Sequence, residues 1–299
     1  MSSYPCGMST RAEVGLTNAS SAGNAPSAGV PFLKGHGTEN DFVLLPDPSG
    51  LLQISEAQVR AVCDRHAGIG ADGIVHIAPG ADGAFFMDYR NADGSLAEMC
   101  GNGARVFARF LVDNRWLPAG EFSFGTRGGT RRAIVPDAGD VTISMGPVTL
   151  GVASRVRASL LSGQNLEFPG TAVDVGNPHL VAITDWDITQ LDLTRAPSYD
   201  QQVFPSGVNI EFVNIRGVDA VQMRVFERGV GETRACGTGT VAVAVAYLAA
   251  SGRTEGLIVV GVLGGQVHVR IEAGEAYLTG PAVIMSSGFI DREWWDLHR

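Results

Sequence analysis

Apolar and polar positions alternate with a period of two along much of the chain, which is the pattern of half-buried β-strands. Val141, Ile143 and Met145 share one face of such a segment, and Thr142 and Ser144 share the other. Short strands around polar, glycine-bearing turns recur in both halves of the sequence. We predict strands on both sides of a turn within 31–45, at 74–89 with a break at Pro79-Gly80, and at 141–145, 223–226, 257–262, 266–271 and 276–278.

The spacing becomes helical after Ser55. Ser55 and Gln58 fit a capping box, in which each side chain hydrogen-bonds the backbone N–H group of the other residue. The helix that they begin is expected to end at Gly68 and to place Cys63 on its apolar face. Cys63 is therefore predicted to be a core residue.

Two further helices are expected to differ in burial. The segment 241–250 is apolar on every face, so it must be enclosed on all sides. The segment 102–112 carries Arg105 and Arg109, so we expect it to be less enclosed or its arginines to be paired. Short strands flank both helices. The predicted fold class is therefore α/β (α+β), with two pseudo-symmetric domains that each curl a barrel-like sheet around a central helix.

The repeated plan suggests where the domains begin and end. Residues 1–30 are rich in Ser, Ala, Gly and Asn and lack the pattern of a secretory signal, so we expect a disordered extension. We place the junction of the two halves at Gly146-Pro147. The N-terminal half then covers 31–145, and the C-terminal half covers 146–282.

Two cysteines lie in nearly identical settings, one in each half. Cys100 and Cys236 each precede a Gly-x-Gly sequence and then an apolar helical run. A helix start is a setting that can lower the pKa of a thiol. Its glycines also let backbone N–H groups approach an anion such as a carboxylate. If the two helix starts face each other across a cleft, one thiolate can remove an α-proton while the opposite thiol returns one, which inverts the carbon.

Several polar residues could assist this chemistry. His179 follows Gly-Asn-Pro in a turn where its ring could reach a cleft, or it is a structural histidine with satisfied hydrogen bonds. Glu227 lies upstream of the second thiol and could tune it, or could form a surface ion pair with Arg228. A polar ring for a zwitterionic ligand could come from asparagines in glycine- or aspartate-bearing turns, namely Asn40, Asn91, Asn177 and Asn209.

Composition excludes several kinds of partner. The net charge of −9 argues against nucleic acid and anionic membranes, and the longest apolar run, 241–250, is too short to cross a bilayer. Four cysteines in 299 residues do not make a disulfide framework, which suggests reduced thiols in a cytoplasmic protein. The single lysine, Lys34, is the only residue that could form a pyridoxal Schiff base, and the His and Cys residues show no metal-ligand spacing. We predict no cofactor and no metal.

From about Pro31 to Leu297 the chain resembles the diaminopimelate epimerase family. The two cysteine segments, Glu-Met-Cys-Gly-Asn-Gly-Ala-Arg and Arg-Ala-Cys-Gly-Thr-Gly-Thr, carry most of the resemblance because they occur in the same order and setting. The other matching segments are Gly-Thr-Glu-Asn-Asp-Phe (37–42), Tyr-Arg-Asn-Ala-Asp-Gly-Ser (89–95), Gly-Asn-Pro-His (176–179), Gly-Val-Asn-Ile-Glu-Phe-Val (207–213) and Glu-Arg-Gly-Val-Gly-Glu-Thr (227–233).

The resemblance implies a cofactor-independent epimerase that interconverts LL- and meso-diaminopimelate on the route to lysine and peptidoglycan. Cys100 and Cys236 would be the paired base and acid, with roles that depend on direction, and His179 and Glu227 would assist them. The resemblance also implies a homodimer and a C-terminal segment, 283–299, that returns to the first domain. The substrate would be bound by Asn40, Asn91, Gly101, Asn102, Asn177, Asn209, Glu227, Arg228, Gly237 and Thr238.

The sequence departs from the family pattern at Ala71-Asp72-Gly73, where many relatives have Phe-Asp-Gln. The glutamine amide that could touch substrate is absent, so water or another side chain must replace it. Gly73 is accordingly left out of the predicted site.

Two other functions fit part of the pattern. An isomerase of the same fold could act on a different amino acid, although paired thiols and a ring of asparagines with Arg228 favour a ligand charged at both ends. A thiol redox protein could use Cys100 and Cys236 as a switchable pair, but no Cys-x-x-Cys sequence is present. A non-catalytic binding protein would not need two thiols.

Overall fold

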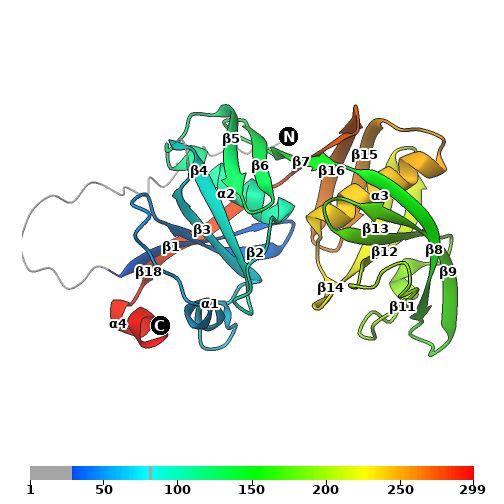
Figure 1. The fold of residues 1–299 in the computed structure, drawn as a ribbon, viewed down its shortest axis with the longest axis horizontal. Coiled ribbons are helices and arrows are strands. Elements are labelled where there is room, and N and C mark those ends of the chain that lie inside the picture. Colours follow the sequence, from blue (N-terminus) through cyan, green and yellow to red (C-terminus); the bar gives the residue numbers. More distant parts are fainter. Residues whose placement is uncertain (1–28, 81–82) are drawn as a thin grey trace, which may run out of the picture.

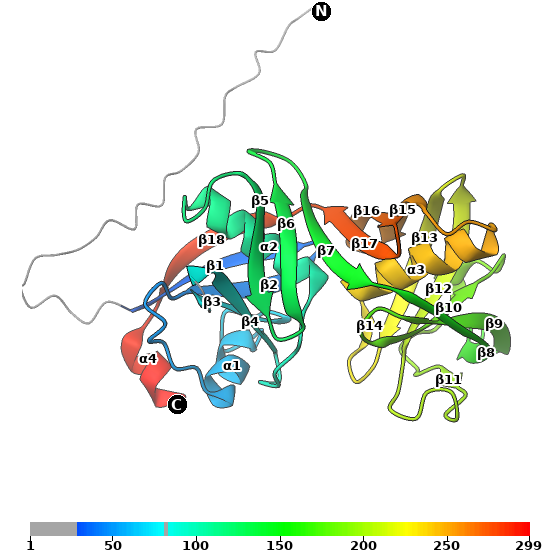
Figure 2. The same cartoon turned by 45° about the horizontal axis from the view of Figure 1, so that its top comes forward.

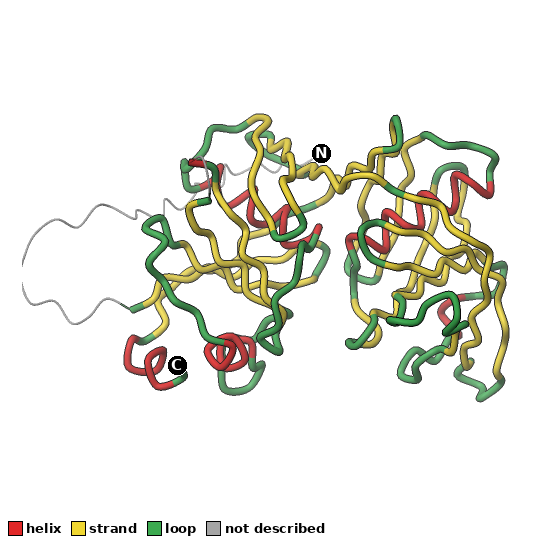
Figure 3. The backbone as a smooth tube through the Cα atoms, in the orientation of Figure 1, coloured by secondary structure: helices red, strands yellow, loops and turns green. Residues whose placement is uncertain are grey.

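The computed structural model describes residues 29–80 and 83–299, which form two bodies that lie side by side (Figure 1). In each body a curved sheet surrounds one helix, α2 in the first body and α3 in the second (Figure 3). The expected extension 1–30 lies outside the described residues except for Gly29 and Val30. Val30 is already the first residue of β1 and is only 3% exposed.

The first body contains the N-terminal strands together with the last strand of the chain. Its strands are β1 (Val30–Gly37), β2 (Asn40–Pro46), β3 (Gly73–Pro79), β4 (Phe85–Asn91), β5 (Gly120–Thr126), β6 (Gly129–Val135), β7 (Val141–Pro147) and β18 (Val283–Ile290). Its helices are α1 (Glu56–Cys63), α2 (Gly101–Asp113) and α4 (Arg292–Leu297).

The second body repeats the plan with a long apolar helix at its centre. Its strands are β8 (Thr149–Ser159), β9 (Asn165–Asp174), β10 (Pro178–Ile183), β11 (Ser198–Tyr199), β12 (Asn209–Gly217), β13 (Ala220–Glu227), β14 (Gly231–Thr233), β15 (Gly256–Val262), β16 (Gly265–Glu272) and β17 (Glu275–Gly280). Its helices are the 3-10 turn η2 (Ile188–Gln190) and α3 (Gly237–Ala250).

Strand β7 joins the two bodies into one hydrogen-bonded sheet. Its Ile143 is paired with Ala133 of β6 on one side and with Leu278 of β17 on the other. In Figure 2, β7 runs from the first body toward the second, with β17 beside it. After β17 the chain returns to the first body, where β18 pairs with β1. The domain boundaries placed at residues 145 and 282 stay a prediction.

Both central helices are deeply buried, although the sequence predicted full enclosure only for α3. Almost all of α3 is enclosed, as its apolar character predicts. Of the two alternatives for α2, the less enclosed helix is wrong, because Arg105 is fully buried and Arg109 is only 5% exposed. The alternative of paired arginines holds for Arg109, which lies 3.5 Å from Asp113 Oδ1 in an ion pair. Arg109 donates to the carbonyl oxygens of Pro136 and Gly139. Loop carbonyls therefore receive this guanidinium, which lets it lie inside the barrel.

Helix α1 begins as predicted and ends earlier than predicted. The Ser55–Gln58 capping box is present, and Cys63 is buried in the core. The helix ends at Cys63 rather than at Gly68 because the Asp64 carboxylate accepts the N–H groups of the next turn. A Cβ atom at Gly68 would lie 2.0 Å from a backbone carbonyl oxygen, so the turn has room only for glycine at this position.

Candidate active site

The first turns of α2 and α3 meet at the contact between the two bodies. A Cβ atom added to Gly237 would lie 3.1 Å from the Cα atom of Gly101. The Asn102 side chain also crosses the contact, because its Nδ2 donates to the Ala235 carbonyl at 3.2 Å. The predicted approach of two remote helix starts is therefore present in the structure.

Both cysteines occupy the residue just before a helix, in the same backbone conformation. Cys100 has φ −131° and ψ 117°, and Cys236 has φ −123° and ψ 117°. Each helix begins with Gly-x-Gly, and no side chain at the first helical residue separates the two backbones. The backbone N–H groups of the first turns lack helical partners and are available to an anion.

Cys100 faces an amide whose orientation is fixed by a carboxylate. The Cys100 Sγ atom lies 3.6 Å from Asn40 Oδ1, which also accepts a hydrogen bond from Asn102 Nδ2 at 3.1 Å. On its other side, Asn40 Nδ2 donates to Asp72 Oδ2 at 2.7 Å. Because Asp72 takes the amide N–H, the amide oxygen points at the thiol and can accept its proton in a hydrogen bond.

Cys236 is the more enclosed of the two thiols, at 7% exposure. Its Sγ accepts the Gly239 N–H group at 3.4 Å and lies 3.5 Å from Thr238 Oγ1. The same threonine hydroxyl accepts a hydrogen bond from Asn177 Nδ2 at 3.4 Å. Asn177 and Thr238, both predicted to bind substrate, thus lie together beside this thiol.

His179 lies inside the protein rather than at the surface of a cleft. Its ring is 0% exposed, so of the two alternatives for His179 the structure shows the buried histidine with satisfied hydrogen bonds. Its Nδ1 atom is 2.7 Å from Glu211 Oε1, and its Nε2 atom is 3.0 Å from Asn177 Oδ1. The histidine therefore links a buried carboxylate to the asparagine beside Cys236, and its direct partners are not the thiols.

Glu211 was not predicted as a site residue, although it lies beneath the start of α3. A Cβ atom at Gly239 would be 2.7 Å from Glu211 Oε1 and 3.3 Å from Cys236 Sγ. The sequence contains one signal for it. Asn209 and Glu211 are two residues apart on β12 and so face the same side of the strand.

The expected alternative for Glu227, an ion pair with Arg228, is not formed in the described part of the chain. Glu227 instead accepts a hydrogen bond from the Thr233 hydroxyl. The Arg228 guanidinium donates to the Ser206 carbonyl at 2.9 Å, and its backbone N–H donates to Asn209 Oδ1 at 2.9 Å. Glu227 is thus bound by Thr233 rather than by Arg228, and Arg228 and Asn209 are neighbours.

Asn91 lies at the end of β4, where its side chain donates to Ser95 Oγ at 3.0 Å. This is the turn role that its sequence context suggests, and it leaves the predicted contact with substrate untested.

Both thiols are held in the protonated form by their surroundings. Burial raises the pKa of Cys100 to about 11, and the Glu227 charge adds to this effect. Burial, with the charges of Glu227 and Glu211, raises the pKa of Cys236 well above its usual value. The lowering expected at a helix start is present through the N–H groups of Gly103 and Asn102, but burial outweighs it at Cys100.

Glu227 is itself a weaker acid than usual. Burial raises its pKa, while the hydrogen bond from the Thr233 hydroxyl lowers it. A carboxylate whose pKa is raised toward that of a neighbouring thiol is a suitable proton acceptor for it.

Other features of the structure lie away from the cysteines. Within residues 29–80 and 83–299, no three His, Cys, Asp or Glu side chains are grouped to hold a metal ion, and none of the helices is long and apolar enough to cross a membrane. The Lys34 ammonium lies 2.7 Å from Asp41 Oδ2 in an ion pair.

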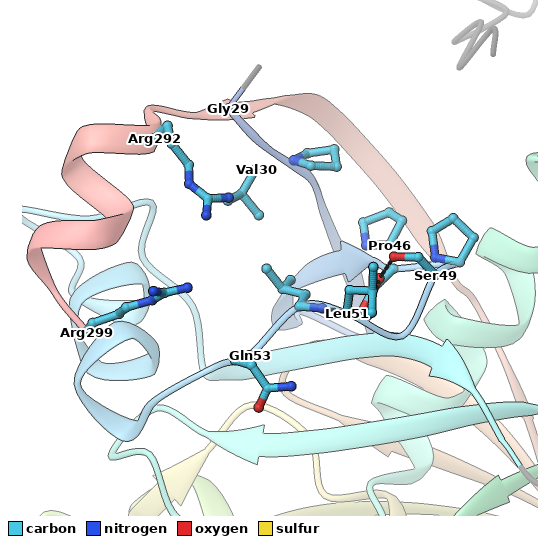
Figure 4. A pocket seen from close by; sticks show the side chains of 12 residues that line it. Gly29, Val30, Pro46, Ser49, Leu51, Gln53, Arg292 and Arg299 are labelled. Atoms are coloured by element: carbon cyan, nitrogen blue, oxygen red, sulfur yellow. Dashed lines mark hydrogen bonds between the residues drawn. The ribbon is translucent and has the colours of Figure 1, made fainter. Parts of the chain in front are cut away.

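A cavity of about 420 Å³ opens between the start of β1 and α4 (Figure 4). Its polar lining includes Arg292 and Arg299, which lie 3.0 and 3.8 Å from the Asp296 carboxylate oxygens. None of the predicted site residues lines it, so we do not assign it to the chemistry of the thiols.

Solved structures share this fold at low sequence identity. A phenazine biosynthesis protein of the PhzF family from Bacillus anthracis aligns with a TM-score of 0.64 and 15% identity, covering 88% of this chain and 99% of that one. A hydroxyproline epimerase from Agrobacterium vitis aligns with a TM-score of 0.61 and 16% identity, covering 88% and 92%. At these identities the similarity establishes the two-domain fold alone.

Sequence relatives are much closer. A diaminopimelate epimerase from Rhodococcus erythropolis is 47% identical, with 90% of this chain and 98% of the relative covered. A diaminopimelate epimerase from Mycobacterium ulcerans is 45% identical, covering 88% and 98%. The family model named diaminopimelate epimerase matches residues 32–151 and 171–285. The chain therefore belongs to the diaminopimelate epimerase family.

Proposed function

We propose that this protein interconverts LL- and meso-diaminopimelate without a cofactor, with Cys100 and Cys236 as the paired acid and base. The observation that supports this most strongly is the meeting of two cysteine-capped helix starts, where the backbones of Gly101 and Gly237 come into contact range. One ligand carboxylate held by both helix starts would place its α-carbon between the two sulfur atoms.

The reaction transfers one proton on each face of the α-carbon. One sulfur, as thiolate, takes the α-proton, so the Cα–H bond breaks and its electron pair delocalises into the carboxylate. The other sulfur then gives its proton to the opposite face, which forms the new Cα–H bond and leaves that sulfur as the thiolate. The helix N–H groups and the polar groups at Asn102 and Thr238 stabilise the extra negative charge on the carboxylate.

One thiol must lose its proton before this reaction begins, because both have raised pKa values in the free protein. Glu227 and Cys236 each shift the pKa of the other, so this buried carboxylate is the candidate to receive that proton. The α-ammonium group of the substrate would favour the thiolate further by its positive charge. His179 assists indirectly, by holding Asn177 against Thr238.

The remaining part of the substrate is a second amino-acid group with its own charges. We propose that it is bound by a set of amide side chains and one guanidinium, which suits a zwitterion at both ends. These residues are Asn40, Asn91, Asn177, Asn209 and Arg228. We also propose that the protein works in the cytoplasm and that it forms a homodimer. Sedimentation velocity would test the homodimer.

The proposal is tested by epimerisation assays on purified protein with LL-diaminopimelate. Cys100→Ala and Cys236→Ala should each lower kcat by at least about 10³-fold, because each removes one of the two proton carriers. Cys63→Ala is the matched control, because Cys63 is a buried thiol in a separate core cluster, and it should keep near-native kcat. Near-native rates in both site variants would refute the two-thiol scheme.

Substrate choice needs a separate comparison, because a hydroxyproline epimerase shares the fold. Solvent deuterium incorporation should be measured with diaminopimelate, proline, histidine and glutamate. We expect α-deuterium only in diaminopimelate. Equal or faster exchange in another amino acid would assign a different substrate to the same pair of thiols.

A further inference from the structure

Gly73 leaves space that a tyrosine ring fills. Gly73 is buried in β3, and a Cβ atom added to it would lie 2.8 Å from Cε2 and 3.2 Å from the hydroxyl oxygen of Tyr89. The same Cβ would be 2.5 Å from the Arg90 carbonyl oxygen. Any side chain at position 73 would therefore compete with the Tyr89 ring, which now occupies the place where a glutamine was expected.

The Tyr89 ring is fixed by packing, but its hydroxyl group has no hydrogen-bond partner in residues 29–80 and 83–299. The residue is 8% exposed, and its ring meets Phe42 edge to face with centroids 5.8 Å apart. Among the described residues, no hydrogen bond is formed by its hydroxyl group, and the oxygen is not sealed from solvent. A largely buried hydroxyl without a protein partner is unusual, because burial without a hydrogen bond costs free energy.

The Tyr89 hydroxyl lies close to the candidate active site. It lies beside Gly73, which directly follows Asp72, the carboxylate that binds Asn40 next to Cys100. Burial raises the pKa of Tyr89 well above its usual value, and ionised Cys100 and Glu227 would raise it further. The hydroxyl therefore stays protonated at neutral pH and can donate a hydrogen bond. Cys100 comes from the first body and Glu227 from the second, so the hydroxyl lies near the same contact that brings the thiols together.

We propose that Tyr89 is a substrate-binding residue whose hydroxyl group donates a hydrogen bond to a carboxylate oxygen of the bound substrate. Gly73 makes this possible by leaving room for the ring, so the pair Gly73 and Tyr89 replaces the missing glutamine side chain. The inference rests on the proposed function, because diaminopimelate supplies the carboxylate. The substrate carboxylate would then be the hydrogen-bond acceptor for the Tyr89 hydroxyl.

The test is Tyr89→Phe, which keeps the ring and removes only the hydroxyl group. KM for LL-diaminopimelate should rise about 10- to 100-fold, the effect of losing a hydrogen bond to a charged group. The thermal unfolding midpoint should stay the same or rise, since the deleted group has no partner in the free protein. If Tyr89 were only a packing residue, KM would stay within twofold of native, and the proposal would be refuted.

Tyr247→Phe is the matched control. Tyr247 is also buried, at 6% exposure, but its hydroxyl accepts the Asp219 N–H group at 3.2 Å near the far end of α3. This variant should lose some stability and keep the native KM, which is the opposite of the pattern expected for Tyr89→Phe. An equal rise of KM in both variants would contradict a specific role for Tyr89.

A binding measurement separates this proposal from the reaction itself. Diaminopimelate is titrated by calorimetry into Cys100→Ala/Cys236→Ala protein, with and without Tyr89→Phe. Tyr89→Phe should weaken the measured affinity by the same factor by which it raises KM. Native protein that does not epimerise diaminopimelate would refute the proposed function. The role of Tyr89 alone would be refuted if native protein is active but Cys100→Ala/Cys236→Ala protein binds diaminopimelate equally well with and without Tyr89→Phe.

Discussion

At the scale of single residues, the two thiols share a backbone conformation and differ in their neighbours. Cys100 faces the amide oxygen of Asn40, while Cys236 faces the Thr238 hydroxyl and the Gly239 N–H group. Both are weak acids in the free protein, because burial outweighs the helix N–H groups. The resting enzyme therefore holds its protons on sulfur until substrate or Glu227 changes the balance.

Alkylation should report this acidity directly. Only the thiolate reacts with iodoacetamide, and below a pKa of about 11 the thiolate fraction of Cys100 rises about tenfold for each unit of pH. We therefore expect labelling of Cys100 in ligand-free protein to accelerate steadily from pH 7 to pH 10 without a plateau. Peptide mass spectrometry separates the cysteines.

Cys63 provides an internal control in the same experiment. It is 5% exposed, and burial raises its pKa to about 12, so it should label more slowly than Cys100 at every pH. A plateau of Cys100 labelling below pH 8 would show that its thiol is more acidic than this structure indicates.

The residue scale also shows what the sequence could not reveal. Both cysteines and most of the predicted polar residues could be named from motifs, because those segments carry their own signals. Asp72 could not, because it acts by orienting Asn40 through a hydrogen bond that only the folded β1–β2–β3 arrangement creates. For His179 the sequence left both a cleft position and a buried position open, because a turn sequence does not show which sheet will cover it.

At the scale of elements, activity depends on how closely the starts of α2 and α3 approach. Two glycines meet there, and no side chain keeps the backbones apart. The large side chains of Leu278 and Met145 pack against Gly101 from the strands that join the two bodies. The helices are thus held end to end by the same strands that form the sheet between the bodies.

Gly237→Ala should disrupt this approach. The added methyl group would lie 3.1 Å from Cα and 3.3 Å from N of Gly101, and backbone atoms cannot move aside as a flexible side chain can. A displacement of the thiols by a few tenths of an ångström or more should lower kcat/KM by about 100-fold. Steady-state kinetics with a thermal unfolding measurement would separate this effect from loss of folding.

Gly217→Ala is the control for that substitution. Its Cβ atom would meet only Ala220 Cβ at 4.0 Å, which is an ordinary contact, so kcat/KM should stay native. Native activity in Gly237→Ala protein would mean that the helix starts need not approach as closely as they do here.

Element prediction succeeded where local pattern determines structure. The strand alternation at Val141 to Met145, the Ser55 capping box and the apolar helix α3 all appear as expected. The pairing of β10 with β12 could not be predicted, because a parallel register joins segments about 30 residues apart. That pairing is what sets Glu211 against His179.

At the scale of the whole molecule, the candidate site lies at a contact between two bodies and is nearly closed. Asn102 is 2% exposed and Cys236 is 7% exposed, whereas Cys100 is half-buried, so substrate can reach Cys236 only if the bodies separate locally. The contacts that would open include the exposed ion pair of Glu39 with Arg234. An exposed pair of this kind contributes little stability, typically below about 1 kcal/mol, so it does not oppose opening strongly.

Hydrogen–deuterium exchange should show both bodies holding one ligand. Adding diaminopimelate to Cys100→Ala/Cys236→Ala protein should slow amide exchange at the starts of α2 and α3 together, because N–H groups from both helices bind the carboxylate. Helix α1 lies away from this contact and should exchange at an unchanged rate, which makes it the internal control. Protection confined to one helix start would contradict a site shared by the two bodies.

The central claim is that two sulfur atoms act on opposite faces of one carbon, and isotope transfer in D₂O tests it most directly. Native protein is mixed with LL-diaminopimelate, and both isomers are examined by proton NMR during the first few per cent of conversion. The account predicts deuterium at the inverted α-carbon of the meso product and none in the remaining LL substrate, because the proton removed by one thiol returns only to its own face. Deuterium appearing equally in substrate and product at early times would show a single exchanging base and contradict the account.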